Sequence, residues 1–513
     1  MTPVAERVCI TNAQPLALAD VPVLSFDAFA DELAEQMAQP TAEISALFGV
    51  PGGSQSLRVY AVISLASTGA LTVMSTDVGD RYPALTPSVT QAHWFERELA
   101  EQWGVVPEGH PWLKPIRFHA SYRNGHDAWG RAVGDKILPG VMPDGVDYFK
   151  VRGEEIHEVA VGPIHAGVIE PGHFRFQCHG EHVFTLEIEH GYQHRGIERR
   201  LVGGPDKRTM HYMETLSGDT SVGHATAYCQ AVEALAGQEA PIRAQAIRAI
   251  ALELERLANH TGDLGALAGD IGYLPTLSFC GRIRGDFLNT TALLCGSRFG
   301  RGLVRPGGVG FDLDEDRIQQ AVDRISAAHR DVTGAVNLLW TSASVLARLE
   351  NIGTVPLETI QALGLIGMAG RASGRDRDGR RDFPSGYFRF AQVPVAVWHS
   401  GDAFARAYVR HLEGQRSCRF ILEQLPQLPA GDVRRSLSPM QADSIVVSIV
   451  EGWRGEICHV AITDSEGKFA HYKVVDPSFH NWIGLAMSLR DQEISDFPLC
   501  NKSFNLSYCG HDL

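Results

Sequence analysis

The hydrophobic positions in the first part of the chain predict strands followed by a helix. Two apolar or alternating runs, LRVYAVISLAS (57–67) and ALTVMSTDV (70–78), are typical of β-strands. The segment SVTQAHWFERELAEQWGV (88–105) follows the helical period and predicts an amphipathic helix. Its candidate core positions are Trp94, Leu99 and Trp103. These elements predict a small α/β domain, which we place at residues 1–150.

A linker and a larger region follow. The stretch ILPGVMPDGVDYFK (137–150) is rich in Gly, Pro and Asp, which is typical of a linker. β-Branched and aromatic residues between turn signals predict strands over 151–200, and the pattern is helical from about 205 to 350. The clearest helix is predicted over 241–270. We therefore expect an α+β chain whose second domain, 151–513, has an N-terminal β region and a mainly α-helical core.

Length and charge restrict the class of protein. A chain of 513 residues is too long for one core and suggests two or three domains. Its formal net charge of −14 and its sequence pI of about 5.8 argue against nucleic-acid binding, which needs clustered cations. The run GRASGRDRDGRRDF (370–383) alternates in the sign of its charges, and we expect a solvated or partner-facing loop there.

The sequence also bears on location. No apolar run reaches the roughly 18 residues of a membrane-spanning helix. The first residues, MTPVAERVCI, lack the basic region and apolar stretch of a signal peptide. We therefore expect a cytoplasmic protein whose link to a membrane, if it has one, is made by partner proteins.

The cysteines and glycines exclude several kinds of site. Nine cysteines are scattered along the chain and no pair has CxxC spacing, which predicts free thiols and argues against a self-contained zinc or iron–sulfur site. The glycine-rich stretch 296–310 lacks the spacing of a dinucleotide or phosphate-binding loop. No nucleotide site is therefore expected, and no sequence motif supports an NADH-binding enzyme.

Two polar motifs could belong to a cavity. GYQHRGIERRL holds His194, Arg195 and Glu198, which could form a polar cluster at a cavity mouth or an ion pair that caps a strand end. In EGWRGE, Arg454 stands between glycines in a tight turn, and its guanidinium could point into a cavity. Near the end of the chain, Cys509 could be a thiol on a frayed surface.

The predicted helix over 241–270 carries a third polar group. Glu253, Arg256 and His260 lie at i, i+3 and i+7, so they share one face of the helix. This spacing favours a buried hydrogen-bonded network that serves structure rather than catalysis.

Taken in order, several segments resemble the large subunit of membrane-bound, energy-converting nickel–iron hydrogenases, above all the formate hydrogenlyase branch. The segments are VGPIHAGVIEPGHFRFQCHGE, GYQHRGIERRL, ELERLANHTGDLGALAGD, RPGGVGFD, RASGRDRDGRRDFP, VEGWRGE and DPSFHNWIGLAMSLRDQEISDFPL. That family shares its fold with the quinone-site subunit of respiratory complex I. HWFERELAEQWGVVPEGHPWLKP (93–115) in turn resembles the complex I 30-kDa-type subunit. The resemblance implies that both parts are fused here.

The resemblance bears directly on metal binding. It implies two CxxC pairs that hold nickel and iron, and it places them on Ser217 and Thr220 and on Leu506 and Cys509. Ser and Thr hydroxyls are poor ligands for these metals at neutral pH, and Leu offers no donor atom. We therefore expect no metal, no nickel–iron centre and no hydrogen production, and we disfavour a hydrogenase with unusual ligands.

The quinone site implied by the resemblance is altered as well. The tyrosine expected to bind the quinone head-group falls on Gly218, and the matching histidine falls near Pro171. Another set of donors, drawn from His173, Asp219 and His224, could bind a quinone, or no ordinary quinone binds there.

Other matched positions keep ionisable side chains. Glu170 matches a glutamate that in the hydrogenases lies near the metal and passes protons, and Arg454 matches the arginine that overhangs the metal. We expect a polar cavity without metal ligands. Its expected catalytic residues are Glu170, His194, Arg195, Glu198, His224 and Arg454. Its expected cofactor-binding residues are His173, Ser217, Asp219 and Thr220.

The resemblance therefore predicts a subunit of a complex I-like or hydrogenase-related oxidoreductase of the NADH dehydrogenase family. Electron transfer from an adjacent iron–sulfur subunit to quinone or an unknown acceptor would be coupled to ion translocation. The chain alone would bind no cofactor, with a quinone as a candidate ligand and a 4Fe–4S cluster in a partner. Expected partners are the iron–sulfur small subunit, a ferredoxin-like subunit and integral membrane subunits, which would hold it on the inner face of the cell membrane. The alternative is a non-catalytic structural or assembly subunit.

Overall fold

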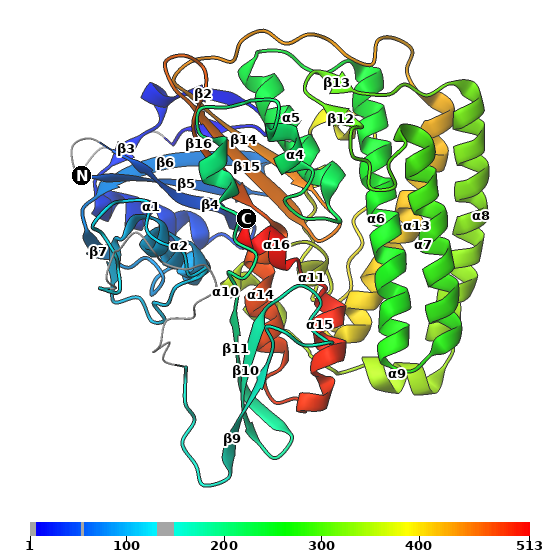
Figure 1. Cartoon of the computed structure of the whole chain (residues 1–513), viewed down its shortest axis with the longest axis horizontal. Helices are drawn as coiled ribbons and strands as arrows, with labels where there is room; N and C mark the ends of the chain where they lie inside the picture. The colour runs from blue at the N-terminus through cyan, green and yellow to red at the C-terminus, as the bar shows by residue number, and fades with distance from the viewer. Residues whose placement is uncertain (1–6, 53–55, 131–147) are drawn as a thin grey trace.

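The computed structural model describes residues 7–52, 56–130 and 148–513. In Figure 1, a strand-rich half lies beside a bundle of long helices, and a three-stranded β-ribbon extends below them. The C-terminus lies near the centre of this view, between these parts. The expected α+β architecture is confirmed.

The first sheet is built from the N-terminal part of the chain. Its order is β1 (Cys9–Ile10), β6 (Ala70–Val78), β5 (Leu57–Leu65) and β4 (Ala42–Pro51), with β3 (Val23–Leu24) parallel to β6. Helix α1 (Phe26–Met37) packs on β4 and β6. The two predicted strands thus form a hairpin, β5–β6, whose residues are mostly buried because other elements cover both faces.

Helix α2 (His93–Trp103) packs against β4 and confirms the predicted helix and its core positions Trp94, Leu99 and Trp103. The structure buries all eleven of its residues, so the helix does not have the exposed polar face of an amphipathic helix. Its charged side chains are instead hydrogen-bonded inside the protein; Glu96, for example, accepts the backbone N–H groups of Leu85 and Thr86 at 2.8 Å.

The second sheet joins the two ends of the chain. Its antiparallel order is β16 (Phe469–Val475), β15 (Glu456–Thr463), β14 (Ser444–Glu451) and β2 (Pro15–Ala17). Strands β15 and β16 also pack on β4, so the first and second sheets share one hydrophobic core. The boundary expected at residue 150 stays a prediction, and most of the linker expected at 137–150 lies outside the described residues.

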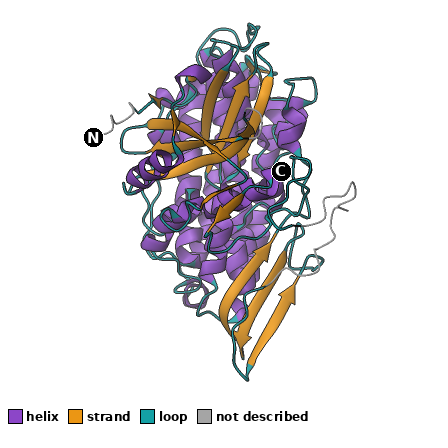
Figure 2. Ribbon diagram, turned by 90° about the vertical axis from the view of Figure 1, so that its left-hand side faces the viewer, coloured by secondary structure: helices purple, strands orange, loops and turns teal. Residues whose placement is uncertain are grey.

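The strands expected over 151–200 are present as the β-ribbon. It consists of β9 (Ile156–Val161), β10 (His173–His179) and β11 (His182–Glu189) in the order β11-β10-β9, and it projects from the molecule in Figure 2. Helix α14 (Pro477–Ser488) packs against β11. The loop between β9 and β10 carries Glu170, and the turn after β11 carries Gly191 to Gly196.

The region expected to be helical from about 205 contains the clearest helix predicted from the sequence, over 241–270. Helix α6 spans Ile242–Asp270 and confirms that prediction. Helix α6 packs against α7 and α13, and α7 packs against α8. The longer helices are α5 (Ser221–Leu235), α6, α7 (Leu274–Cys295), α8 (Glu315–Trp340) and α13 (Ala403–Gln424). The remaining α-helices are α3 (Ile197–Leu201), α4 (Thr209–Met213), α9 (Ala343–Leu349), α10 (Leu357–Leu363), α11 (Gly367–Arg371), α12 (Gly379–Asp382), α15 (Phe497–Phe504) and α16 (Tyr508–Asp512). Short elements complete the chain: η1 (Leu18–Asp20), η2 (Thr90–Ala92), η3 (Gly386–Arg389), η4 (Leu425–Gln427), η5 (Ile494–Asp496), β7 (Arg81–Pro83), β8 (Val106–Glu108), β12 (Val304–Arg305) and β13 (Gly308–Val309).

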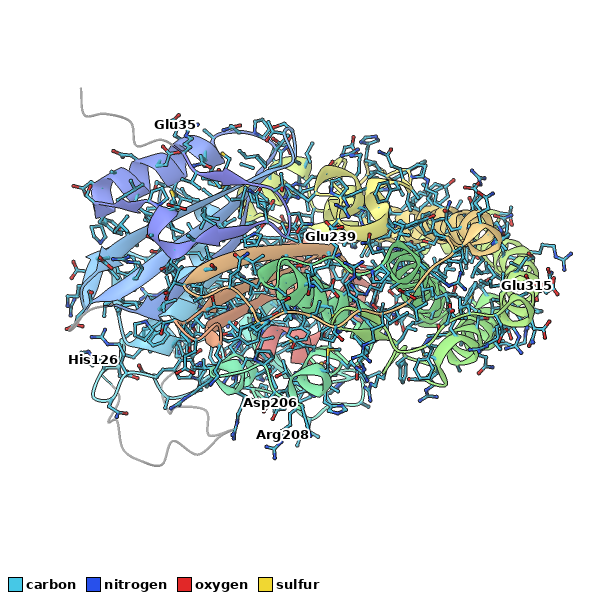
Figure 3. All side chains as sticks on the ribbon, turned by 90° about the horizontal axis from the view of Figure 1, so that it is seen from above. Glu35, His126, Asp206, Arg208, Glu239 and Glu315 are labelled. Atoms are coloured by element: carbon cyan, nitrogen blue, oxygen red, sulfur yellow. The ribbon has the colours of Figure 1, made fainter. Side chains whose placement is uncertain are left out.

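The expectation of a solvated loop at 370–383 is wrong. Its residues Arg371, Arg375, Arg377, Asp378 and Arg380 are at most 6% exposed. They meet acidic side chains from distant elements, namely Glu43, Glu253, Glu413, Glu451 and Glu456. By contrast, labelled charged side chains such as Glu35, Asp206 and Glu315 lie at the rim of Figure 3. The run is buried because its cations complete a network of carboxylates.

The helix α6 contributes the centre of that network. Arg256 lies 3.2 Å from Glu253 and 3.3 Å from Glu413, which itself lies 2.9 Å from His260. All four side chains are almost fully buried. The predicted structural network on this helix face is confirmed, and its acidic partner Glu413 comes from α13.

Candidate functional site

Four separate parts of the chain meet around α16. Glu170 comes from the loop between β9 and β10, and residues 217–220 directly precede α5. Arg454 comes from the turn between β14 and β15, and Cys509 lies in α16 itself. Continuous contacts join these parts, so four regions far apart in sequence form one cluster.

An ion pair between Arg454 and Asp219 holds one side of the cluster. The guanidinium donates to the two carboxylate oxygens at 2.6 and 2.8 Å and to the Asn505 carbonyl at 2.6 Å. It also lies 3.8 Å from the centre of the Trp453 ring. Although burial opposes ionisation, Arg454 lowers the pKa of Asp219 below its ordinary value. Asp219 is therefore held as a carboxylate, and the tight turn closed by Gly455 fixes the arginine.

Hydroxyl groups extend this pair toward the thiol. The Oγ atom of Ser217 donates to Asp219 at 3.1 Å and lies 2.9 Å from the Oγ of Ser507. The Ser507 Oγ lies 3.4 Å from the Sγ of Cys509. Thr220 donates to Asp219 at 3.1 Å. A continuous hydrogen-bonded path thus runs from the carboxylate to the thiol.

Glu170 closes the path at the other side of Cys509. One carboxylate oxygen of Glu170 accepts the backbone N–H groups of Tyr508 and Cys509 at 3.0 and 3.1 Å, and the other lies 3.4 Å from the Cys509 sulfur. Burial, and then the charge of Glu170, raises the pKa of Cys509, so the sulfur stays a thiol at neutral pH. Glu170 has a φ of +78°, in the left-handed region that non-glycine residues rarely adopt. Tertiary contacts therefore place this carboxylate against a protonated thiol.

These residues do not fit a nickel–iron centre. Of the four positions where the resemblance implies thiolates, Ser217 and Thr220 are hydroxyls hydrogen-bonded to Asp219. Leu506 is a buried hydrocarbon side chain, 5% exposed. Cys509 alone offers sulfur, and one thiol cannot supply the soft donor set that such metals need.

His224 belongs to a different buried group. Its Nε2 lies 3.0 Å from Asp476, and its Nδ1 lies 3.1 Å from Nε2 of His459. His459 in turn lies 2.9 Å from the Tyr472 hydroxyl. This chain connects α5 to β15 and β16, and its side chains are buried.

Two other expected histidines are bonded to backbone carbonyls. Nδ1 of His173 lies 3.1 Å from the Gly162 carbonyl, and Nδ1 of His194 lies 2.7 Å from the Asp512 carbonyl. The His194 ring also stacks on His119 with 4.5 Å between ring centres. Through Asp512, His194 supports α16 rather than the polar path.

Arg195 contacts the cluster from outside. Its guanidinium donates to the carbonyl groups of Thr215 and Leu216 at 2.7 and 2.9 Å, and to that of Cys509 at 3.3 Å. These bonds join the segment before Ser217 to α16. Arg195 therefore fixes the spacing between the two halves of the hydroxyl path.

Glu198 lies in a buried ion-pair group beside the site. It accepts the backbone N–H of Val474 at 2.9 Å, and it lies 3.0 Å from the Lys473 ammonium. Lys473 also donates at 2.7 Å to both oxygens of Glu98, which pairs with Arg117 as well. Of the three expected site residues in GYQHRGIERRL, Glu198 thus joins an ion-pair network, whereas His194 and Arg195 contact the C-terminal helix α16.

Two further polar groups are not predictable from sequence motifs. Ser507 links the hydroxyls to Cys509, and only its place two residues before that cysteine could have pointed to it. Glu255 accepts the backbone N–H groups of Val222 and Gly223 at 2.7 and 3.1 Å, and burial raises its pKa to about 8. A cavity of about 10 Å³, lined by Asp219 and Glu255, has room for about one water molecule.

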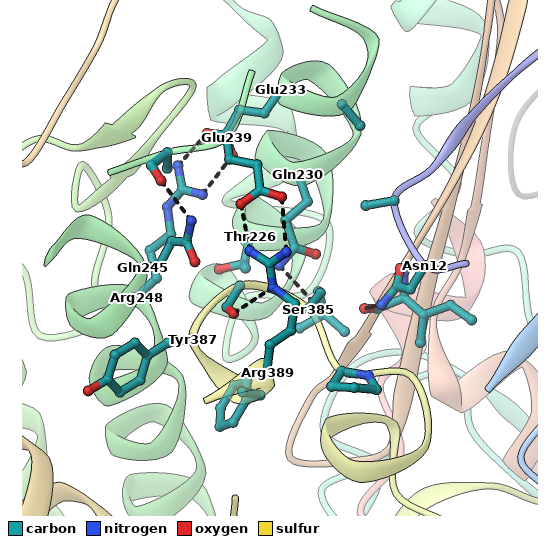
Figure 4. Close-up of a pocket in the computed structure, with 18 of the residues that line it drawn as sticks. Asn12, Thr226, Gln230, Glu233, Glu239, Gln245, Arg248, Ser385, Tyr387 and Arg389 are labelled. Carbon is teal, nitrogen blue, oxygen red and sulfur yellow. Dashed lines mark hydrogen bonds and ion pairs between the residues drawn. The ribbon is translucent and has the colours of Figure 1, made fainter. Parts of the chain in front are cut away.

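A separate pocket lies on another face of α5 and α6. Its volume is about 320 Å³, and its lining includes none of the cluster residues. Figure 4 shows Arg389 paired with Glu239 and Arg248 paired with Glu233 among the residues that line it. The pocket is therefore distinct from the path between Glu170 and Arg454.

Similarity to known proteins identifies the family. The model of the respiratory-chain NADH dehydrogenase 49-kDa subunit matches residues 270–444, and that of the 30-kDa subunit matches residues 21–127. The D-type subunit of the NADH-quinone oxidoreductase of Clostridium beijerinckii is 31% identical over 311 residues, which cover 60% of this chain and 83% of that protein. The chain belongs to this family.

The family includes hydrogenase subunits. Formate hydrogenlyase subunit 5 of Escherichia coli is 28% identical over 446 residues, covering 83% of this chain and 76% of that protein. A carbon monoxide-induced hydrogenase of Rhodospirillum rubrum is 28% identical over 352 residues, or 68% of this chain and 97% of that protein. The resemblance to complex I-like and hydrogenase-related subunits is thereby confirmed. None of the helices in the described ranges is long and apolar enough to cross a bilayer.

Proposed function

We propose that this member of the family is a subunit of a membrane-associated, complex I-like oxidoreductase that works without nickel and iron in this chain. It would couple electron transfer, from an iron–sulfur subunit to a quinone or another acceptor, to ion translocation by membrane subunits. The observation that carries the proposal is the polar path from Glu170 through Cys509, Ser507, Ser217 and Asp219.

The path suits proton handling better than metal binding. Hydroxyls and a thiol can pass a proton because each is both a donor and an acceptor. Glu170 and Asp219 stand at the two ends, and Arg454 keeps Asp219 ionised. Glu255, with a pKa of about 8 beside a one-water cavity, is a further group that exchanges a proton near neutral pH.

The other expected residues take supporting roles in this proposal. Arg195 and His194 hold α16, which carries Cys509, and Glu198 anchors the neighbouring strand through Lys473. His173 and Thr220 remain candidates for contact with a bound acceptor. His224, whose Nε2 lies 3.0 Å from Asp476, would hold that carboxylate in position.

The proposal includes the partners that its redox step requires. This chain has one thiol in the cluster and offers no cluster ligand set there, so the 4Fe–4S cluster would be in the small subunit. A ferredoxin-like subunit would supply electrons, and integral membrane subunits would hold the complex on the inner face of the cell membrane.

Glu170→Gln tests the proton path. The amide keeps the size of the carboxylate and can still accept one N–H, but it cannot take up a proton at neutral pH. We expect quinone-analogue reduction by the intact complex to fall about 100-fold, in the range usual for loss of a positioned proton acceptor. Native gel electrophoresis should show the same assembled complex.

Glu158→Gln is the matched control, because Glu158 is an exposed residue of the same ribbon. It should leave turnover unchanged. Wild-type turnover in Glu170→Gln would show that this carboxylate takes no part in the reaction.

A scaffold without catalysis is the second candidate, and one observation favours it. The hydroxyls and the Asp219 carboxylate are hydrogen-bonded to one another or to Arg454, as in a purely structural network. In that case Glu170→Gln and Ser217→Ala complexes would both assemble and turn over normally.

A further inference from the structure

A buried group of metal-ligand side chains lies where the end of α16 meets the residue after β11. His190 follows β11, and His511 and Asp512 end α16. One potential ligand atom from each residue lies within 4.8 Å of the other two. Across residues 7–52, 56–130 and 148–513, this is the group of three or more His, Cys, Asp or Glu side chains that comes close enough to hold an ion.

The two imidazoles have unpartnered nitrogens. Both ring nitrogens of His190 and the Nε2 of His511 are buried without a hydrogen-bond partner. His190 is 2% exposed and His511 is 0% exposed, and the ring centres lie 4.2 Å apart. A buried polar atom without a partner costs about 1–3 kcal/mol. Three such atoms in two adjoining rings therefore indicate a missing ligand between them.

The three side chains carry donor atoms that suit a divalent cation. A neutral imidazole offers a lone pair on one ring nitrogen. Asp512 supplies a carboxylate. The Nδ1 of His511 lies 3.0 Å from Oδ1 of Asp512, so a nitrogen and an oxygen donor already lie at about the separation of two ligands on one zinc ion.

The backbone holds the carboxylate in place and leaves it able to bind. Asp512 accepts the N–H groups of Gly191 at 2.8 Å and Gln193 at 2.9 Å. With the contact from His511, these use three of the roughly four acceptor positions of a carboxylate. The nearby cation Arg117 donates to the His511 carbonyl at 2.8 Å, but it is paired with Glu98. Its charge is therefore largely balanced.

We propose that His190, His511 and Asp512 bind one zinc-type divalent ion that ties the C-terminal helix to the end of β11. Two imidazoles and one carboxylate suit Zn²⁺, and a fourth position is left for water or a carbonyl oxygen. Zinc bonds of about 2.0–2.1 Å require ligand atoms about 3.4 Å apart in a tetrahedron. The three ligand atoms lie within 4.8 Å of one another and would have to approach to that separation when the ion binds.

This site differs from a nickel–iron centre in position and donors. It contains no sulfur, and none of its three residues is at a position where the resemblance implies a thiolate. Its effect would be to hold α16, whose Tyr508 and Cys509 N–H groups bind Glu170. The metal would thus be structural, and it does not depend on the proposed proton path.

Elemental analysis of the full-length chain tests the site. After dialysis against metal-free buffer, we expect about one zinc per chain, and a chelator should lower the thermal midpoint. His190→Gln and His511→Gln should each reduce the metal to background. His480→Gln, at a histidine that is also buried but lies outside the group, should retain it.

Cobalt offers a second measurement that does not require a variant to fold. The chelator-treated wild type, reloaded with Co²⁺, should gain visible absorption bands of tetrahedral cobalt, and added Zn²⁺ should remove them. Metal-free wild type that takes up neither ion would overturn the site and leave a buried water as the partner of the nitrogens. Metal that persists in both variants would also overturn it. Both readouts measure metal, so they stay separate from the turnover test of Glu170.

Discussion

Replacing Arg371 with methionine is expected to lower the free energy of unfolding by about 3–5 kcal/mol, the usual cost of removing one partner of a buried ion pair. Arg371 is 1% exposed and lies 2.9 Å from Glu413 and 2.8 Å from Glu451. It also donates to the Arg377 carbonyl at 2.9 Å. Methionine fills similar space but leaves two buried carboxylates with fewer cations.

The first unfolding transition in urea, followed by tryptophan fluorescence, measures this loss. Arg381→Met is the matched control, because Arg381 belongs to the same charged run but its side chain is 36% exposed. Its contact with Asp376, whose side chain is 63% exposed, is at the surface, where an ion pair contributes at most about 1 kcal/mol. Equal losses in the two variants would contradict a buried role for Arg371.

Lys473→Met should lower the free energy of unfolding at neutral pH by about 2–3 kcal/mol. It should also make this free energy fall less steeply as the pH is lowered. Burial alone would favour the protonated form of Glu98, but Lys473, followed by Arg117, holds its pKa at about 2. The Lys473 ammonium lies 2.7 Å from both carboxylate oxygens. Removing it leaves Glu98 with one of these two cations.

The direction of the pH dependence follows from the lowered pKa. In the folded protein Glu98 titrates near 2, below its ordinary value of 4.5. The stabilisation is therefore present above pH 4.5 and is lost as the pH falls from about 4.5 to about 2; the difference corresponds to about 3 kcal/mol.

Urea titrations at pH 7, 4 and 3 measure both effects. Lys468→Met is the control, since this lysine is 55% exposed and pairs with Glu466 at the surface. The control should follow the wild-type curve. An unchanged slope between pH 7 and 3 in Lys473→Met would show that Glu98 does not depend on this ammonium.

The buried charges show where sequence reasoning failed. An alternating run of Arg and Asp is usually solvated, and nothing within 370–383 indicates otherwise. The acidic partners of this run are supplied by β4, α6, α13, β14 and β15. A sequence pattern contains no information on such remote pairing, so only the fold could distinguish a buried network from a surface loop.

The candidate site was predictable in part. The resemblance indicated Glu170, Ser217, Thr220 and Arg454 by their positions in motifs, and the structure brings these residues together with Asp219. The sequence offers Asp219, His173 and His224 as alternative quinone donors, but the hydrogen bonds of the two histidines go to Gly162 and to Asp476 and His459. The reason is that a motif names a residue type and position, whereas the direction of a side chain depends on its neighbours.

Cys509 illustrates the same limit. Its nearness to the end of the chain suggests a frayed thiol, yet α16 is packed inward and Leu513 is 2% exposed. The backbone N–H groups of Arg195 and Gly196 donate to the Leu513 carbonyl at 2.8 and 3.0 Å. Contacts with residues about 320 positions earlier therefore order the terminus.

The sequence by itself determined the kinds of elements, the long helix α6 and the family, and it has Ser, Thr and Leu at three of the four positions where the resemblance implies thiols. Each of these depends on local periodicity or on the identity of a residue within a motif. Only the tertiary structure decided which charges are buried, how Ser507 joins Ser217 to Cys509, and that His190 meets His511 and Asp512. Burial and hydrogen bonding depend on atoms that the fold brings together from distant parts of the chain, and local sequence does not specify those distances.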